Sequence, residues 1–132
     1  MLESNIGQAA PSHRTPGQIG TKLRRVGHDF GYPTGGIGHW CPACGVMHVV
    51  SIDAPQSDGK RFEWDGNKAS PTILPDIDIK WGDQVNPRVN GHGGGRCHYI
   101  INAGVIEFLF DCTHKMNGQR VPLPDLPGHL RD

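Results

Sequence analysis

The chain has 132 residues, a length typical of a single domain, and its 13 basic residues are balanced by 13 acidic residues. This balance argues against general nucleic-acid binding and against membrane-surface binding, because proteins of both classes carry an excess of basic residues. The 19 Gly and 11 Pro are about twice the usual share, which predicts few long regular elements.

Hydropathy and cysteine content indicate a cellular compartment. No segment approaches the roughly 18 apolar residues that a membrane-spanning helix needs. The N-terminal segment also lacks the apolar stretch of a secretion signal. We therefore expect a cytoplasmic protein, whose four cysteines serve metal or redox chemistry rather than disulfide formation.

The first half of the chain predicts an arm followed by short strands. Residues 1–26 are expected to form a flexible N-terminal arm, and residues 27–39, with five Gly, an irregular lead-in. Strands are predicted at 46–52, from β-branched content, and at 61–64, before an Asp-Gly turn. Residues 73–81 alternate Ile with charged residues and predict a half-buried strand, which Pro75 places at a sheet edge.

The second half of the chain predicts a hairpin and a tail. After a long Gly-rich loop at 82–96, strands at 97–101 and 105–110 are joined through Asn102-Ala103-Gly104. Residues 121–132 are rich in Pro and are expected to lie extended on the surface, because Pro excludes a helix or a central strand. Residues 27–120 then form the folded unit: a mainly β, zinc-ribbon-like antiparallel domain with long Gly/Pro-rich loops and extended termini.

The pentapeptide Cys41-Pro-Ala-Cys44-Gly is the most specific motif in the chain. Two thiolates separated by two residues can bind one ion from a tight turn, and the following Gly permits positive φ. A thioredoxin-like redox pair is the alternative, but it requires the motif at a helix start within a βαβ unit. Because a strand follows directly, the motif predicts a Zn²⁺ site.

The predicted hairpin supplies the remaining ligands. Cys97 begins its first arm and Cys112 follows its second arm, so both reach the open end of the hairpin. Cys41, Cys44, Cys97 and Cys112 would form a closed structural site, and His114 is the alternative fourth ligand. Should only three side chains bind, a water would remain on the metal and catalysis would be possible.

Several acid–base groups surround these cysteines. The catalytic candidates are His48, His98, Asp111 and His114, each of which could instead orient a metal ligand or make a structural hydrogen bond. The sequence contains no HExxH, no P-loop, no deaminase signature and no G-x-S-x-G motif. Without a catalytic signature, the sequence favours a non-enzymatic role.

Four groups of motifs occur together in the chain: CPACG with His48, Trp64 before Pro71-Thr72, Cys97-His98 before a Gly-turned hairpin, and Asp111-Cys112-Thr113-His114 before Gly118-Gln119. Together they resemble a family of small proteins from phages, prophages and bacterial operons, of unknown function and often mislabelled "ammonia monooxygenase". The resemblance covers roughly two thirds of the chain. It implies metal binding and an origin in a mobile element, and it does not imply oxygenase chemistry.

Three functional hypotheses follow from these observations. The first is a zinc-stabilised protein-binding module, phage- or prophage-encoded, that contacts a host or phage protein. The second is a zinc-dependent hydrolase with an open metal position, and the third is a virion or assembly component. The first predicts a protein partner, and none of the three predicts binding to nucleic acid or membrane.

Overall fold

The fold was analysed in a computed structural model, which describes residues 17–32, 34–52, 54–55, 59–81 and 95–132. Within these residues the chain forms two antiparallel β-sheets and two short 3₁₀ helices, η2 (His28–Phe30) and η3 (Gly128–Leu130). The predicted mainly β, antiparallel fold class is confirmed. No helix in the described part of the chain is long and apolar enough to cross a membrane.

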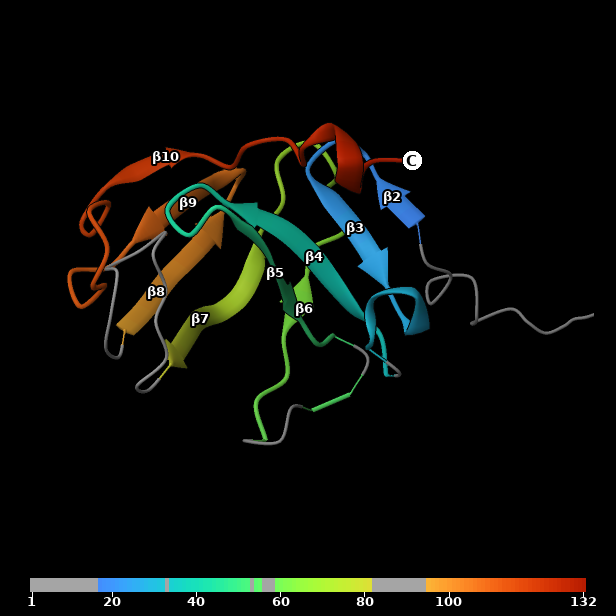
Figure 1. The fold of residues 1–132 in the computed structure, drawn as a ribbon, viewed down its shortest axis with the longest axis horizontal. Coiled ribbons are helices and arrows are strands. Elements are labelled where there is room, and N and C mark those ends of the chain that lie inside the picture. The colour runs from blue at the N-terminus through green and yellow to red at the C-terminus, as the bar shows by residue number, and fades with distance from the viewer. Residues whose placement is uncertain (1–16, 33, 53, 56–58, 82–94) are drawn as a thin grey trace, which may run out of the picture.

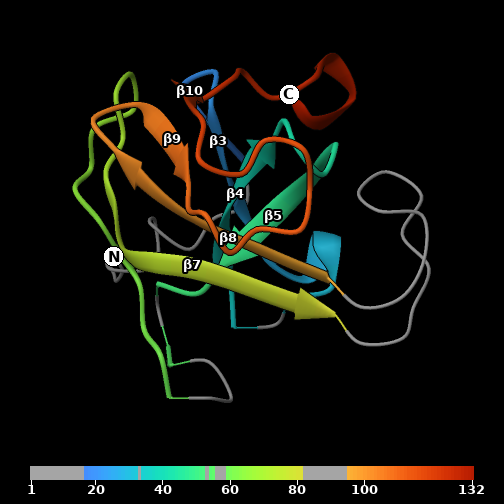
Figure 2. The same cartoon turned by 90° about the vertical axis from the view of Figure 1, so that its left-hand side faces the viewer.

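The larger sheet has five strands in the order β10-β9-β8-β7-β6. Its two long strands, β7 (Ile73–Trp81) and β8 (Gly95–Asn102), lie side by side in Figure 2. The sheet is completed by β6 (Glu63–Trp64), β9 (Val105–Phe108) and β10 (Arg120–Pro122). β8 and β9 form the predicted hairpin, which turns at Ala103 and Gly104, both with positive φ.

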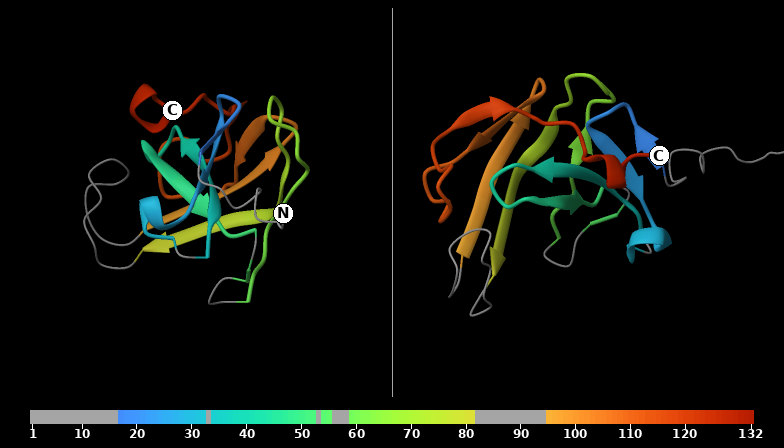
Figure 3. Two further views of the ribbon diagram at one scale, coloured as in Figure 1. Left: turned by 90° about the vertical axis from the view of Figure 1, so that its right-hand side faces the viewer. Right: turned by 45° about the horizontal axis from the view of Figure 1, so that its top comes forward.

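The smaller sheet has four strands in the order β2-β3-β4-β5. These are β2 (Gly17–Ile19), β3 (Leu23–Val26), β4 (Gly36–Cys41) and β5 (Val46–Val50). The two sheets form two layers (Figures 1 and 3). A single apolar cluster joins the layers, because it contains Leu23 and Ile37 of the smaller sheet together with Ile77, Tyr99 and Phe108 of the larger one.

All five predicted strands are present, and four of them have shifted ends. The strands predicted at 97–101 and 105–110 are β8 and β9. The strand predicted at 46–52 is β5, the one at 61–64 is the shorter β6, and the one at 73–81 matches β7. The predicted edge position of β7 is wrong, because β7 lies between β6 and β8. Pro75 is accommodated since β6 pairs only with Ile73 and Leu74, and the β7–β8 register is irregular between Ile73 and Ile77. Most of the predicted 82–96 loop lies outside the described residues.

The N-terminal part of the smaller sheet departs from the sequence prediction. Residues 17–26, assigned to a flexible arm, contain β2 and β3, and residues 36–39 of the predicted irregular lead-in belong to β4. Glycine is required in β4 by close packing rather than by a turn. A Cβ on Gly36 would lie 2.6 Å from Val49 Cγ1, and one on Gly38 would lie 2.6 Å from Met47 Sδ.

The C-terminal tail contacts both sheets. It runs along the edge of the larger sheet as β10 and then crosses towards β2 and β3, where the C-terminus lies (Figure 1). The Leu126 N–H donates to the carbonyl of Thr21, and the Gln18 N–H donates to the Asp132 carboxylate. Leu123 and Leu126 are buried, and Gly128–Leu130 form η3, so the tail contributes to the core instead of only lying extended on the surface.

Candidate functional site: a cysteine–histidine cluster and a histidine–carboxylate array

The central strand β8 carries two groups of functional residues on opposite faces. Side chains alternate along a strand, so residues two apart share a face. Cys97, Tyr99 and Ile101 face the core and are fully buried, whereas Arg96 and His98 lie on the other, partly exposed face. The consecutive residues Cys97 and His98 therefore belong to two different sites.

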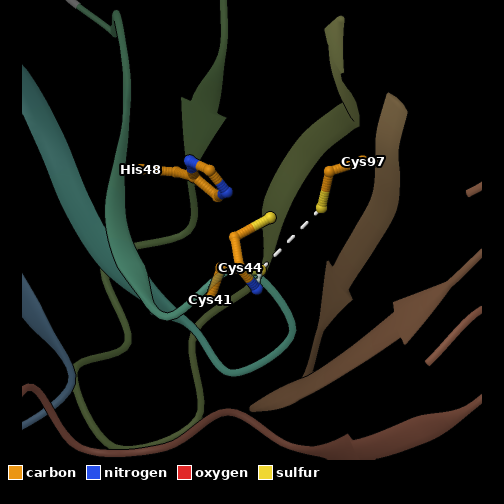
Figure 4. Close-up of side chains that lie close together, drawn as sticks. All are labelled: Cys41, Cys44, His48 and Cys97. Atoms are coloured by element: carbon orange, nitrogen blue, oxygen red, sulfur yellow. Dashed lines mark hydrogen bonds between the residues drawn. The ribbon is translucent and has the colours of Figure 1, made fainter. Parts of the chain in front are cut away.

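The inner site is a cluster of Cys41, Cys44, His48 and Cys97 (Figure 4). Cys41 ends β4, Cys44 lies in the turn, His48 lies on β5, and Cys97 comes from β8 of the other sheet. Within the turn, the Cys44 N–H donates to Cys41 Sγ at 3.4 Å. Gly45 donates to the Cys41 carbonyl at 2.8 Å and has a φ of 69°, the conformation for which the CPACG motif supplies a glycine.

The cluster has the dimensions of a tetrahedral metal site. Its ligand atoms all lie within 4.8 Å of one another, and the Cys41 and Cys97 sulfurs are 3.8 Å apart. Two sulfurs bound to one tetrahedral zinc at about 2.3 Å each are about 3.8 Å apart. His48 Nε2 is buried without a hydrogen-bond partner, as are His39 Nδ1 and His114 Nε2, and of these three histidines only His48 lies within the cluster. The donor set and its spacing fit zinc.

The electrostatics of the cluster also favour a cation. Hydrogen bonds from Cys44 and Cys97 lower the pKa of Cys41, so this sulfur is the thiolate. The hydrogen bond to the Cys41 thiolate raises the pKa of Cys44 to about 12, and the same thiolate raises the pKa of Cys97. Three buried sulfurs can all be deprotonated only when a positive charge is bound among them.

The predicted ligands Cys112 and His114 lie outside this cluster. Cys112 Sγ contacts the backbone of His98, 3.2 Å from its nitrogen and 3.1 Å from its oxygen. The His114 ring packs edge-on against Phe108, and its Nδ1 accepts a hydrogen bond from the Met116 N–H. The structure places His48, predicted as an acid–base or orienting group, beside the three cysteines instead.

The outer site is an array of three side chains, Asp76, His98 and Asp111. His98 Nδ1 lies 2.9 and 3.1 Å from the two carboxylate oxygens of Asp111, and Nε2 lies 2.5 Å from Oδ2 of Asp76. Asp76 comes from β7, and Asp111 lies in the turn that follows β9, so one carboxylate reaches His98 from each side of β8. Both nitrogens of one imidazole are thus held by carboxylates.

Arg96 fixes this array from the same face of β8. Its guanidinium forms two hydrogen bonds with Asp78, at 2.9 and 2.7 Å, and an ion pair with Asp111 at 3.0 Å. Asp78 stands opposite His98 in the β7–β8 register. Since Arg96 holds both oxygens of Asp78, the neighbouring Asp76 is the carboxylate that contacts His98.

Charge complementarity stabilises the ionised forms in the array. Burial lowers the pKa of His98, but the hydrogen bonds to Asp76 and Asp111 outweigh it and place the pKa above the ordinary value. The hydrogen bonds with His98 also hold the pKa of Asp76 and of Asp111 below the ordinary value for aspartate. The His98 side chain is 13% exposed, and the two carboxylates are 41% and 42% exposed, so the array is open to solvent.

The chain is thus a small antiparallel β protein with a buried cysteine–histidine cluster that could hold a metal and, on its surface, His98 held between two carboxylates. The family model for "bacterial ubiquitination-like system serine protease (BubE)" matches residues 11–109, three quarters of the chain. The chain belongs to this family. No curated protein and no solved structure matches it.

This membership corrects the predicted function. The prediction of a zinc-stabilised protein-binding module is wrong, because the matched family is one of serine proteases. The match likewise gives no support to the zinc hydrolase or to the virion component. The resemblance noted in the sequence is supported as far as a small bacterial family, and the match says nothing of phage origin.

Sequence reasoning found His98 and Asp111 but missed Asp76 and His39. The signal for Asp76 was the alternation of acidic residues with Ile in residues 73–81, which places Asp76 and Asp78 on the polar face. Predicting that this face lies beside His98 requires the β7–β8 register, and no local motif encodes that register. His39 is buried beside the cluster and bonds to the Tyr99 hydroxyl, and it lies in the segment predicted to be irregular.

Proposed function

We propose that this chain hydrolyses a peptide or isopeptide bond in a bacterial ubiquitination-like system. His98 is the acid–base group, and Asp111 is the carboxylate that orients it. The observation that carries this proposal is the outer array, in which a carboxylate holds Nδ1 while Nε2 faces a second strand at a solvent-open surface. Membership of a serine protease family supports the same reaction class.

Each residue then has a defined role. In hydrolases of this type, the imidazole takes a proton from the attacking group and passes it to the leaving amine. The partner at Nδ1 fixes the tautomer and ring orientation and stabilises the imidazolium that forms. Arg96 positions Asp111 through its ion pair, so Arg96 acts on the reaction through another residue.

The test is cleavage of a ubiquitin-like protein from the same bacterium that carries a C-terminal peptide extension. Cleavage is followed by mass spectrometry. His98→Ala is expected to lower the rate at least about 100-fold, and Asp111→Asn to lower it by a similar or larger factor. His129→Ala is the matched control, because this exposed histidine lies in η3. Cleavage that survives His98→Ala would refute the assignment.

We further propose that Cys41, Cys44, Cys97 and His48 hold a structural zinc ion. The supporting observations are the 3.8 Å sulfur spacing and the unpartnered His48 nitrogen. Four side chains fill a tetrahedral site, so zinc would supply a rigid link rather than an open coordination position. This link would join the β4–β5 turn to β8. The sequence-predicted alternatives Cys112 and His114 stay predictions, which variants of each can test.

The protein partner predicted from the sequence becomes a substrate in this proposal. The family description names a ubiquitination-like system, so the partner class is a ubiquitin-like protein or its conjugate. The partly exposed array suits a flexible protein C-terminus, which can reach His98 across an open surface. The phage or prophage origin and the cytoplasmic location stay predictions.

A further inference from the structure

The group that faces His98 Nε2 is a carboxylate, although the family is one of serine proteases. We propose that Asp76 occupies the position of the catalytic serine, so that this chain forms no acyl-serine intermediate. This inference rests on the proposed function for its chemistry. It concerns a different observation, the identity of the residue at the nucleophile position.

The geometry around His98 defines that position. In a Ser-His-Asp triad, the carboxylate bonds to Nδ1, and the nucleophile bonds to the other ring nitrogen, Nε2. Asp111 satisfies the first condition at 2.9 Å, and Asp76 satisfies the second at 2.5 Å. Asp76 lies on β7 on one side of β8, and Asp111 lies in the turn after β9 on the other side, so Asp76 is not a second orienting group on the Nδ1 side.

No serine within the described residues competes for this role. Ser51 and Ser70 are the serines of that part of the chain, and neither hydroxyl bonds to a histidine ring there. Ser70 belongs to a turn in which its N–H donates to the Asn67 side chain. The carbonyl of Ser51 accepts the N–H of Phe62. Ser4, Ser12 and Ser57 lie outside the described residues, so the test below includes them.

The reaction changes with the nucleophile, and its atoms still balance. Asp76 and His98 accept one proton from a water molecule, whose oxygen attacks the substrate carbonyl carbon. The C–N bond of the tetrahedral intermediate breaks, and the leaving amine takes that proton from His98. The products are a carboxylic acid and an amine, with no covalent enzyme intermediate and no other reactant than water.

Asp78 provides a built-in comparison for Asp76. Both carboxylates lie on the same face of β7, and Asp78 stands directly opposite His98 in the register. Asp78 is held at both oxygens by Arg96 and is 18% exposed. Asp76 is 41% exposed, with Oδ2 at His98 and Oδ1 3.9 Å from Lys60 Nζ. We therefore expect His98 to activate a serine placed at 76 but not a serine placed at 78.

The experiment measures labelling by a fluorophosphonate probe, which reacts with an activated serine hydroxyl and releases fluoride. The proteins are the full-length wild type, Asp76→Ser, Asp78→Ser and the double variant Asp76→Ser/His98→Ala. Peptide mass spectrometry locates any label. We expect no labelled serine in the wild type, and labelling of Asp76→Ser at least tenfold faster than of Asp78→Ser or of the double variant. Melting temperature confirms that each variant is folded.

Asp76→Cys gives a second measurement at the same position. Serine is one bond shorter than aspartate, so its Oγ lies about 1 Å further from Nε2 than the present carboxylate oxygen. The longer C–S bond of cysteine recovers part of that distance. We expect residue 76 of this variant to react with iodoacetamide at least tenfold faster than it does after His98→Ala is added.

The outcomes separate this inference from the proposed function. A labelled serine in the wild type overturns the inference, as do folded Asp76→Ser and Asp76→Cys variants whose reactivity is independent of His98. Cleavage by a wild type that carries a labelled serine would leave the proposed function intact and refute only the inference. A wild type that does not cleave, beside a reactive Asp76→Ser, would refute the proposed function and leave the position of Asp76 established.

Discussion

Removing one sulfur from the inner cluster tests how the two sheets are held together. Cys97 is the only cluster residue from the larger sheet, so Cys97→Ser would detach β8 from the β4–β5 turn. Chelation with an excess of a strong zinc ligand is the equivalent perturbation of the wild type. Both are expected to destabilise the whole fold rather than one loop.

The size of the effect follows from the loop that the proposed metal ion would close. A link between Cys44 and Cys97 encloses 52 intervening residues. The chain-entropy model gives about 4 kcal/mol for closing a loop of that length. This is a large part of the roughly 5–15 kcal/mol that stabilises a typical domain. For a chain of this size, the melting temperature should fall by about 10–20 °C.

The assay is thermal unfolding followed by circular dichroism, together with zinc determination by elemental analysis. Cys112→Ser is the matched control, since Cys112 is also buried but its Sγ hydrogen-bonds to the His98 backbone and lies outside the cluster. This variant should retain zinc and lose about 1 kcal/mol. Protein purified without zinc, an unchanged melting curve after chelation, or a loss of zinc from Cys112→Ser would refute the assigned ligand set.

Two further predictions concern single residues in each sheet. Asp78→Asn should cost about 1 kcal/mol, because it weakens the paired hydrogen bonds with Arg96. Arg96 lowers the pKa of Asp78 in the folded state, so this contribution should be constant from pH 7 to pH 5 and decline only as the pH falls below about 4. Urea unfolding of both proteins across this range measures the difference, and a decline beginning near pH 6 would implicate another group. Gly36→Ala should destabilise the fold by about 1–3 kcal/mol, because the new Cβ would lie 2.9 Å from the fixed carbonyl oxygen of Val50. Gly38→Ala should destabilise it less, because the new Cβ would contact only the flexible side chain of Met47. Equal losses in urea unfolding would contradict this reading of the packing.

The sequence predicted the larger sheet well because its signals are local. The alternation in 73–81 and the Asn-Ala-Gly turn each fall within a few residues, and β7, β8 and β9 follow from them. Of the smaller sheet, only β5 was predicted, and β2, β3 and β4 were missed. In β4 the reason is that glycine permits a close approach to β5. Gly36 and Gly38 lower strand propensity locally, and their purpose is visible only once β5 lies beside them.

The candidate sites were predictable to the extent that residue spacing reports geometry. CPACG gave Cys41 and Cys44 because both lie in one turn, and the position of Cys97 at the start of a strand brought it into the same group. The expected pairing of Cys97 with Cys112 assumed that both point inward. In the structure, Cys112 contacts the backbone of His98, and His48 from β5 lies with the cluster instead. Side-chain direction past a strand end is set by tertiary packing, which spacing does not encode.

Because Cys97 and His98 are adjacent in β8, the positions of the inner cluster and the outer array depend on each other. With period-two alternation, a slip of β8 by a single residue would turn the imidazole inward and the thiol outward, abolishing both together. Selection on either residue therefore preserves the alignment of the other. An oxidant that reacted with the buried sulfurs would therefore be expected to displace His98 and disrupt the outer array without reacting with it.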